Sequence, residues 1–259
     1  MKKLTKMFAL LLALAMVLAL AACGGKSNDK MVYAVETGSA GEAAALEKGW
    51  EINSVDTQAK ALMEVASGTS DAAIIDLLMA GAMIGEGTSY PDLKFTDELT
   101  SEEYGVGCRK GSDLAAFINV VLAETYADGT MEQIATTYGV QAALAEQGEA
   151  QEWSAGDGDV AYIQSKGKLI VGITDFAPMD YQDDNGEWIG FDADMARIVA
   201  EKLGVEIEFI EIDWDSKIME LDSKNIDVVW NGMTLTDAVL EAMECSNAYC
   251  NNAQVVVTK

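Results

Sequence analysis

Hydrophobic and polar residues follow one another in short units that predict strands and helices in turn. The apolar run Lys168–Ile173 predicts a buried strand, and Asp184-Asn185-Gly186 predicts the turn of a hairpin. Asp192 begins a predicted amphipathic helix, and Val205–Ile212 alternates apolar and acidic residues as a half-buried strand does. The apolar positions of the helix recur at helical spacing: Met195, Ile198, Val199 and Leu203.

The first half of the chain repeats strand and helix units of similar length. Strands are predicted over Met31–Val35, Trp50–Val55 and Asp71–Asp76, and helices over Ala59–Ala66 and Leu77–Ile84. Alternation of this kind predicts an α/β fold with a parallel sheet.

A polar segment separates this half from the second. Two more helices are predicted before it, one around Leu114–Leu122 and one over Met131–Tyr138. The segment Gln147–Gly158 is polar and rich in glycine, which is typical of a linker.

The first residues are typical of a secretory signal. Lys2, Lys3 and Lys6 precede the apolar stretch Phe8–Leu20, which is short for a transmembrane helix, so residues 1–22 are predicted to be a signal peptide. Leu20-Ala21-Ala22-Cys23 resembles a bacterial lipobox, in which the cysteine is lipidated. The alternative is ordinary cleavage after Ala22 with a free Cys23. The expected localisation is extracytoplasmic, anchored to the cell membrane by lipid on Cys23, with residues 23–30 as a tether.

Charge and composition narrow the class of function. The chain has a formal net charge of −26, which repels nucleic acid and anionic membrane surfaces. Such a charge favours solubility or a cationic ligand. Half of the residues are hydrophobic, which excludes a disordered chain and leaves enough for two lobes.

The residue types present exclude several chemistries. The chain has no histidine, which excludes Ser-His-Asp and Cys-His catalysis and histidine zinc sites. Cys108, Cys245 and Cys250 match no metal spacing, so no metal is expected. They are interpreted as small buried residues, with a Cys245–Cys250 disulfide as the alternative.

The predicted strand–hairpin–helix–strand order over residues 167–212, with TDFAPMDYQ after its first strand, resembles a known family. It is similar to the opening of the family 3 extracellular solute-binding proteins, the polar-amino-acid receptors of ABC importers. VETGSAGEAA, the segment ending in Asp76, and YGVGCRKGSDL resemble later parts of the same family. The family order is therefore inverted here, which suggests a circular permutation, natural or engineered.

The resemblance implies a type II periplasmic-binding-protein-like fold, with a ligand cleft between two lobes that close on the ligand. Lobe 1 is expected over 99–252, and lobe 2 over 31–98 plus 253–259. Residues 148–158 would join the two ends of the usual family order.

The resemblance also assigns candidate ligand-binding residues. Phe176 and Trp214 match positions that supply aromatic walls, although a core role is the alternative for both, and Trp230 is expected to be core. Gly232 and Thr234 match positions that contact the backbone of an amino acid.

Four further residues complete the expected site. Asn231 is expected to contact the variable part of the ligand, with a simple Asn-Gly turn as the alternative. Asp76 matches the aspartate that accepts the ligand's ammonium, and its alternative role is to cap the following helix. Ser39 and Ala40 begin a helix whose N-terminus could hold an anion.

One position departs from the family. An arginine that grips the α-carboxylate is replaced by Val239, and the two arginines of the chain, Arg109 and Arg197, match a surface-strand and an exposed helix position. A ligand carboxylate is therefore expected to meet only neutral donors and to contribute little to affinity.

The expected function is that of a solute receptor of an ABC importer, a monomer that binds a small amine-bearing solute, an amino acid in the first instance. Its partners would be that ligand and the transporter permease, without any cofactor, and it would not be an enzyme. An extracytoplasmic sensor subunit is the alternative. A dehydratase on the same fold is a weaker alternative, since the arginine and all histidines are absent.

Overall fold

A computed structural model describes residues 30–259 except 97, 152 and 155. The predicted signal peptide, Cys23 and nearly all of the predicted tether lie outside the described residues. Within the described ranges, no helix is both long and apolar enough to cross a membrane.

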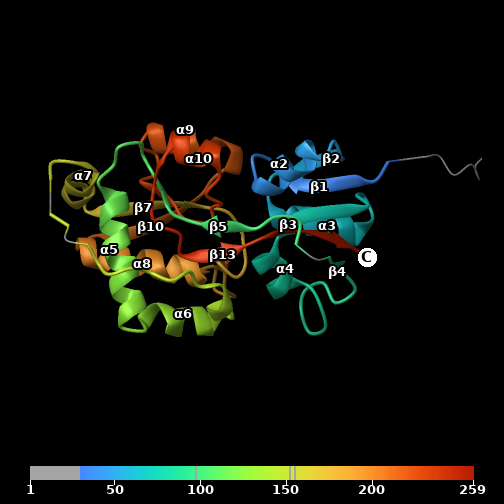
Figure 1. Ribbon diagram of the computed structural model, residues 1–259, viewed down its shortest axis with the longest axis horizontal. Helices are drawn as coiled ribbons and strands as arrows, with labels where there is room; N and C mark the ends of the chain where they lie inside the picture. The colour runs from blue at the N-terminus through green and yellow to red at the C-terminus, as the bar shows by residue number, and fades with distance from the viewer. Residues whose placement is uncertain (1–29, 97, 152, 155) are drawn as a thin grey trace, which may run out of the picture. The chain divides into compact units, whose positions relative to one another are not determined.

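The first sheet has the strand order β2-β1-β3-β14-β4. Its parallel strands are β1 (Val32–Glu36), β2 (Glu51–Val55) and β3 (Ala72–Asp76). β14 (Gln254–Thr258) pairs antiparallel with both β3 and β4 (Lys94–Phe95). The red end of the chain therefore enters the blue and cyan sheet in Figure 1.

Helices cover both faces of this sheet because successive residues of its buried strands point to opposite sides. One face packs on α3 (Gln58–Ser67) and α4 (Leu77–Met83), and the other packs on α2 (Ala40–Glu47).

The second sheet has the strand order β10-β7-β11-β6-β12. β10 (Glu206–Glu211), β7 (Lys168–Ile173) and β11 (Val228–Val229) are parallel. β6 (Gly107–Cys108) and β12 (Glu244–Cys245) extend the sheet in antiparallel pairing.

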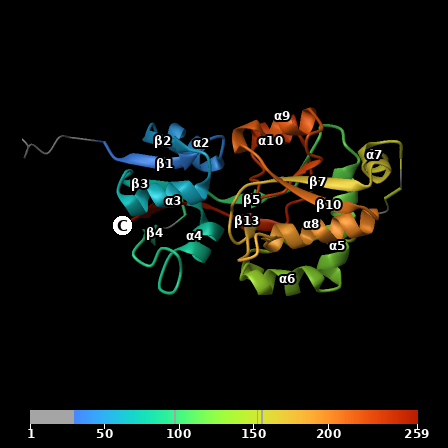
Figure 2. The same cartoon turned by 180° about the vertical axis from the view of Figure 1, so that it is seen from behind.

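This sheet is also covered on both faces. The long helices α5 (Leu114–Ala127), α6 (Thr130–Tyr138) and α8 (Phe191–Leu203) contribute to the larger apolar cluster with one face of β7. The second face packs against α9 (Lys217–Asp222) and α10 (Asp237–Ala242), which lie together in Figures 1 and 2.

Two short strands lie between the sheets in chain order. β5 (Glu102–Tyr104) follows the last N-terminal strand of the first sheet, and β13 (Cys250–Asn252) precedes β14. They pair antiparallel with each other, with Asn252 opposite Glu102. The chain thus passes between the two sheets twice, along one two-stranded ribbon.

The remaining elements are small. β8 (Tyr181–Gln182) and β9 (Trp188–Ile189) form the predicted hairpin, and Gly186 in its turn has a φ of +81°. α7 (Asp159–Lys166) precedes β7, and single 3₁₀ turns occupy Gln141–Ala143 and Trp214–Ser216.

The predicted α/β fold is confirmed, since two mixed sheets each carry helices on both faces. One helix boundary differs from the expected one, and one alternative interpretation of the cysteines is excluded. The helix expected to start at Asp192 starts at Phe191, and the Asp192 carboxylate, instead of capping it, accepts hydrogen bonds from Gly232 N and Tyr249 Oη. The alternative Cys245–Cys250 disulfide is not formed, because both cysteines are free.

Candidate ligand-binding site

A cavity of about 450 Å³ lies where parallel strands of both sheets end. Glu36 and Asp76 are the last residues of β1 and β3, while Trp214 follows β10 and Asn231 follows β11. Loops at the carboxyl ends of parallel strands are where α/β proteins commonly bind ligands. Seven of the predicted ligand-binding residues line this cavity: Ser39, Ala40, Asp76, Trp214, Asn231, Gly232 and Thr234.

Phe176 is the predicted residue that does not line the cavity. Its side chain is buried, and its ring lies 6.3 Å from that of Tyr104 in an edge-on contact. Gly232 has a φ of +55°, and a Cβ there would lie 2.2 Å from Phe176 Cε1. Phe176 therefore supports the loop that carries Gly232, and only a glycine fits above it.

Amide side chains from three elements hold the Asp76 carboxylate. Gln58, at the start of α3, and Gln254, in β14, donate to Asp76 Oδ2 and Oδ1 respectively. Asn252 Nδ2 also donates to Oδ1, over 2.6 Å, while Asp76 N donates to Gln58 Oε1 over 2.8 Å. The carboxylate occupies the N-cap position of α4 but makes no capping hydrogen bond, so the alternative capping role of its side chain is wrong.

A second carboxylate shares these donors. Glu102 Oε1 accepts from Asn252 Nδ2 over 2.7 Å and from Gln254 Nε2 over 2.6 Å. Burial raises the pKa of Asp76 well above its usual range, and the charge of Glu102 raises it further. A cation beside Asp76 would oppose both effects and lower the pKa of this carboxyl.

The helix N-terminus at Ser39 is already occupied by a carboxylate of the chain. Ser39 Oγ accepts from Glu42 N over 3.1 Å, and Gly38 N donates to Glu42 Oε2 over 2.8 Å. The arrangement resembles a capping box, whose sequence signature Ser39-Ala40-Gly41-Glu42 carries, but the Glu42 carboxylate binds the N–H before the N-cap residue, since Ser39 N donates to Glu36 O. The signature could have been recognised in the sequence, and it weakens the case for an anion site there.

The loop after β11 also directs its polar groups inward. Asn231 Oδ1 accepts from Thr174 N, and Asn231 Nδ2 donates to Thr174 Oγ1, both over 2.8 Å. Gly232 N donates to Asp192 Oδ2 over 2.7 Å. The side chain of Asn231 and the N–H of Gly232 are thus engaged within the chain, although both residues line the cavity.

Two buried charged residues of the cavity were not among the predicted ones. Lys217 is buried, and its Nζ lies 4.6 Å from the centre of the Trp214 ring. The same atom donates to Trp214 O over 2.9 Å and to Gly38 O over 3.1 Å. The spacing of three residues between Trp214 and Lys217 in a helical turn was the one sequence signal for this contact.

Glu36 is the second such residue. Its side chain is 3% exposed, and no donor among the described residues lies within hydrogen-bond distance of its Oε1. Burial raises the pKa of Glu36 to about 8, against the attraction of Lys217. The pKa of Lys217 is lowered to about 8 by burial, against the attraction of Glu36. The lining thus includes a basic residue, Lys217, which the expectation of only neutral donors for a ligand carboxylate did not take into account.

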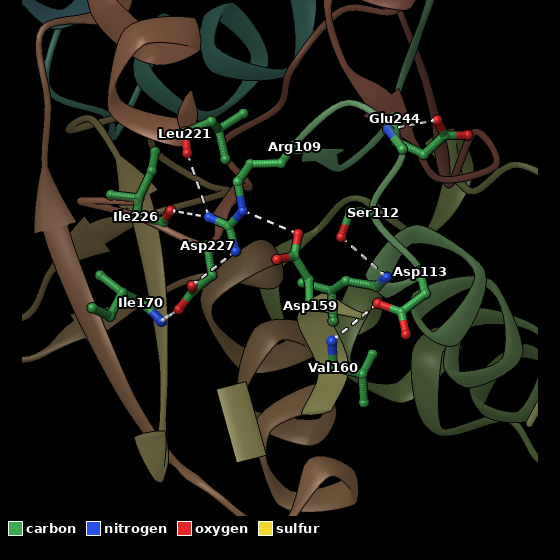
Figure 3. Close-up of polar contacts among 12 residues, drawn as sticks. Arg109, Ser112, Asp113, Asp159, Val160, Ile170, Leu221, Ile226, Asp227 and Glu244 are labelled. Carbon is green, nitrogen blue, oxygen red and sulfur yellow. Dashed lines mark hydrogen bonds and ion pairs between the residues drawn. The ribbon is translucent and has the colours of Figure 1, made fainter. Parts of the chain in front are cut away.

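Arg109 is buried, which contradicts the expected surface position. Its Nε donates to Asp159 Oδ2 over 3.0 Å, one amino group to Asp227 Oδ1 over 3.3 Å, and the other to Ile226 O over 2.8 Å. Figure 3 shows the guanidinium between these acceptors. Arg109 thus ties α7 to the start of β11, away from the cavity, whereas Val239 lines the cavity as expected.

A larger cavity of about 680 Å³ contains none of the predicted ligand-binding residues. Its lining includes Tyr138, Asp175, Tyr181, Trp188 and Glu211. Within the described residues, no group of histidine, cysteine and acidic side chains is arranged to hold a metal ion. The cavity with Asp76 and Lys217 is therefore the candidate site.

Comparison with known proteins adds a family to this geometry. Residues 169–259 match the sequence model of the bacterial extracellular solute-binding proteins, family 3. This part of the chain is similar to the family 3 solute-binding proteins. The predicted resemblance to the family is confirmed there, whereas the resemblance of the earlier segments to later parts of the family stays a prediction.

Two curated relatives are named as cystine-binding proteins. The L-cystine-binding protein TcyJ of Escherichia coli (strain K12) is 32% identical over 123 residues, which are 47% of this chain and 46% of TcyJ. The L-cystine-binding protein TcyA of Bacillus subtilis (strain 168) is 38% identical over 109 residues, 41% of this chain and 40% of TcyA. The chain thus matches less than half the length of these relatives.

One similar solved structure is a substrate-binding protein of an ABC uptake transporter from Streptococcus pneumoniae with bound histidine. It is 37% identical to this chain, and the match covers 36% of this chain and 38% of that one, with a TM-score of 0.34.

Proposed function

We propose that this protein is the extracytoplasmic solute receptor of an ABC importer and that it binds a small amine-bearing solute, an amino acid. The cavity that holds the buried Asp76 carboxylate at the carboxyl end of β3 is the observation that carries this proposal. Buried carboxylates need a compensating partner, and an ammonium supplies both a charge and hydrogen-bond donors. The names of the curated relatives, which are binding proteins for amino acids, support the same function.

The ligand would lie between two lobes that close around it. In this proposal, lobe 2 comprises residues 31–98 plus 253–259, and lobe 1 comprises 99–252. The two strands β5 and β13 would act as the hinge, because the chain passes between the sheets only along them in the described residues. Solute binding would involve no chemical step.

A permuted chain order and a lipid anchor complete the proposal. The family match lies at residues 169–259, whereas the strands at 32–76 share a sheet with β14 at the other end of the sequence. This arrangement is what a circular permutation joined through 148–158 would produce. Lipidation at Cys23 would hold the receptor at the membrane near its permease partner.

A thermal-shift panel tests the function. The purified protein is melted with each standard L-amino acid, L-cystine, putrescine and choline. At least one amine should raise the melting temperature, because a ligand at about 100 times its dissociation constant adds roughly 2.7 kcal/mol to the free energy of unfolding. A panel without any stabilising amine would contradict the proposed function.

The variant Asp76→Asn localises the effect. It keeps the shape of the side chain and should weaken binding of the stabilising amine by roughly 1.5–3 kcal/mol, as expected for a charge-assisted hydrogen bond. Asp92→Asn, an exposed position in the same part of the chain, is the matched control and should bind as the wild type does. Equal affinity of the wild type and Asp76→Asn, with both folded, would remove Asp76 from the ligand site.

A further inference from the structure

The candidate cavity contains one cation of the chain itself. Among its lining residues, Lys217 is the only one with a basic side chain, whereas Glu36, Glu42, Asp76 and Asp237 are acidic. Lys217 begins α9 and is 7% exposed, so its ammonium is removed from bulk water. Burying an ammonium costs free energy unless its N–H donors are hydrogen-bonded and its charge is paired.

The hydrogen bonds of Lys217 leave part of this requirement unmet. An ammonium has three N–H donors, and two of them reach the carbonyl oxygens of Trp214 and Gly38. Neither acceptor carries a net charge. In the described part of the chain, no carboxylate oxygen lies within 4.0 Å of Nζ. The charges of Glu36 and Asp215 attract this ammonium from beyond that distance, so one donor remains available at the cavity wall.

The position of this ammonium changes the expected role of Trp214. The ring was expected to form an aromatic wall of the site, and Lys217 Nζ already lies 4.6 Å from its centre. A second cation at this ring would be repelled by the first. A ligand group beside Lys217 is therefore stabilised by a negative charge and destabilised by a positive one.

We propose that Lys217 is a specificity-determining residue that binds the carboxylate of the ligand. It supplies the positive charge that the arginine replaced by Val239 would have supplied. With Asp76 as the acceptor for the amine, the substrate class is a zwitterion, a free α-amino acid, and not a simple amine or an amino-acid amide. This inference rests on the proposed function and refines it.

The test compares free amino acids with their carboxamides. The probe is the L-amino acid, among the twenty standard ones and L-cystine, that binds the wild-type protein most tightly in calorimetry, together with its α-carboxamide. The wild type should bind the free acid about tenfold or more tightly than the amide. Lys217→Met should lose about that factor for the acid and little for the amide.

The control and the rescue use the same measurement. Lys48→Met is the matched control, since Lys48 also lies over a tryptophan, 5.6 Å from the Trp50 ring, but does not line the cavity. It should bind acid and amide as the wild type does. Lys217→Arg retains the charge and should keep the preference for the acid, which tests the proposal even where Lys217→Met does not fold.

Three outcomes would overturn the inference. A wild type that binds acid and amide equally would show that no charge reads the carboxylate. A Lys217→Met protein that loses equal affinity for both would show that Lys217 only supports the fold of the site. A wild-type protein that binds putrescine but none of the amino acids would show that the ligand is not a zwitterion, while the proposed amine site would stand. Binding of no amine at all would instead contradict the proposed function itself.

Discussion

Carboxylates at the ends of neighbouring strands dominate the chemistry of the candidate site at the scale of single residues. Glu36 ends β1 and Asp76 ends β3, and these strands pair in parallel. Both side chains are buried, and the pKa of each is raised chiefly by that burial. Burial therefore disfavours the charged forms of both carboxyls, and a bound cation would favour them.

The stability of the protein should depend on pH through Glu36. The pKa of this carboxyl is about 8 in the folded chain, against 4.5 for an unperturbed glutamate. Between these values the folded chain retains a proton that the unfolded chain has released, so the free energy of unfolding falls as the pH rises. Glu36→Gln removes this contribution and should gain roughly 1–3 kcal/mol relative to the wild type between about pH 5 and about pH 7.5.

Urea denaturation of both proteins at the two pH values measures this difference. Glu51→Gln is the control, since Glu51 begins the neighbouring strand β2 and is exposed. The pKa of Lys217, whose charge attracts Glu36, is lowered to about 8. Lys217 therefore makes the free energy of unfolding rise with pH, but only above about that pH. Parallel pH profiles for the wild type and Glu36→Gln would show that Glu36 is ionised in the folded protein and would refute this account.

Sequence patterns predicted where the strands end but not which side chains lie together at those ends. Asp76 was found because an acidic residue closes an apolar strand, and the same signal was present at Glu36, which is followed by Thr37-Gly38. Lys217 could not be found in this way, since its contact with Gly38 O joins residues 179 positions apart. Phe176 was misplaced because the pattern does not show that Gly232 lies directly above its ring.

Strand β14 is the element on which the arrangement of the first sheet depends. It lies between β3 and β4, and Val255 and Val257 are fully buried while Val256 is partly exposed on the opposite face. The three residues are all valines, so this alternation follows from strand geometry and is not visible as a pattern in the sequence. That the last strand belongs to the same lobe as residues 31–98 was inferred from a family resemblance, because no local pattern specifies partners so distant in sequence.

Removing β14 should disrupt the first sheet. A protein without Gln254–Lys259 loses the strand that pairs with both β3 and β4, as well as the amide that Gln254 donates to Asp76. It should melt at a lower temperature and bind no ligand. As milder variants, Val255→Ala and Val257→Ala should each cost about 2 kcal/mol of unfolding free energy, and Val256→Ala clearly less.

Chemical denaturation compares the truncated protein and the three valine variants with the wild type. The Val256→Ala protein controls for the loss of two methyl groups on the same strand. A truncated protein that melts and binds as the full chain does would mean that β14 contributes nothing to the first sheet or to the site.

At the scale of the whole molecule, the cavity depends on contacts between residues of both sheets. Lys217, from the second sheet's helix α9, donates to Gly38 O in the loop after β1. A Cβ on Gly38 would lie 2.9 Å from Asp215 Cα, so this loop approaches the start of α9 closely. In the proposed receptor, the contacts between Gly38 and Lys217 would be retained or remade as the lobes close around the ligand.

The most direct test of the central claim is a calorimetric titration that removes the amine from the ligand. The full protein is titrated with the amino acid that stabilises it most and with the deaminated analogue of that compound, which differs only in the amine. Because Asp76 would lose its cationic partner, the analogue should bind at least about tenfold more weakly than the amino acid. Equal affinities for the two compounds, or heat of binding from neither, would contradict an amine-binding receptor.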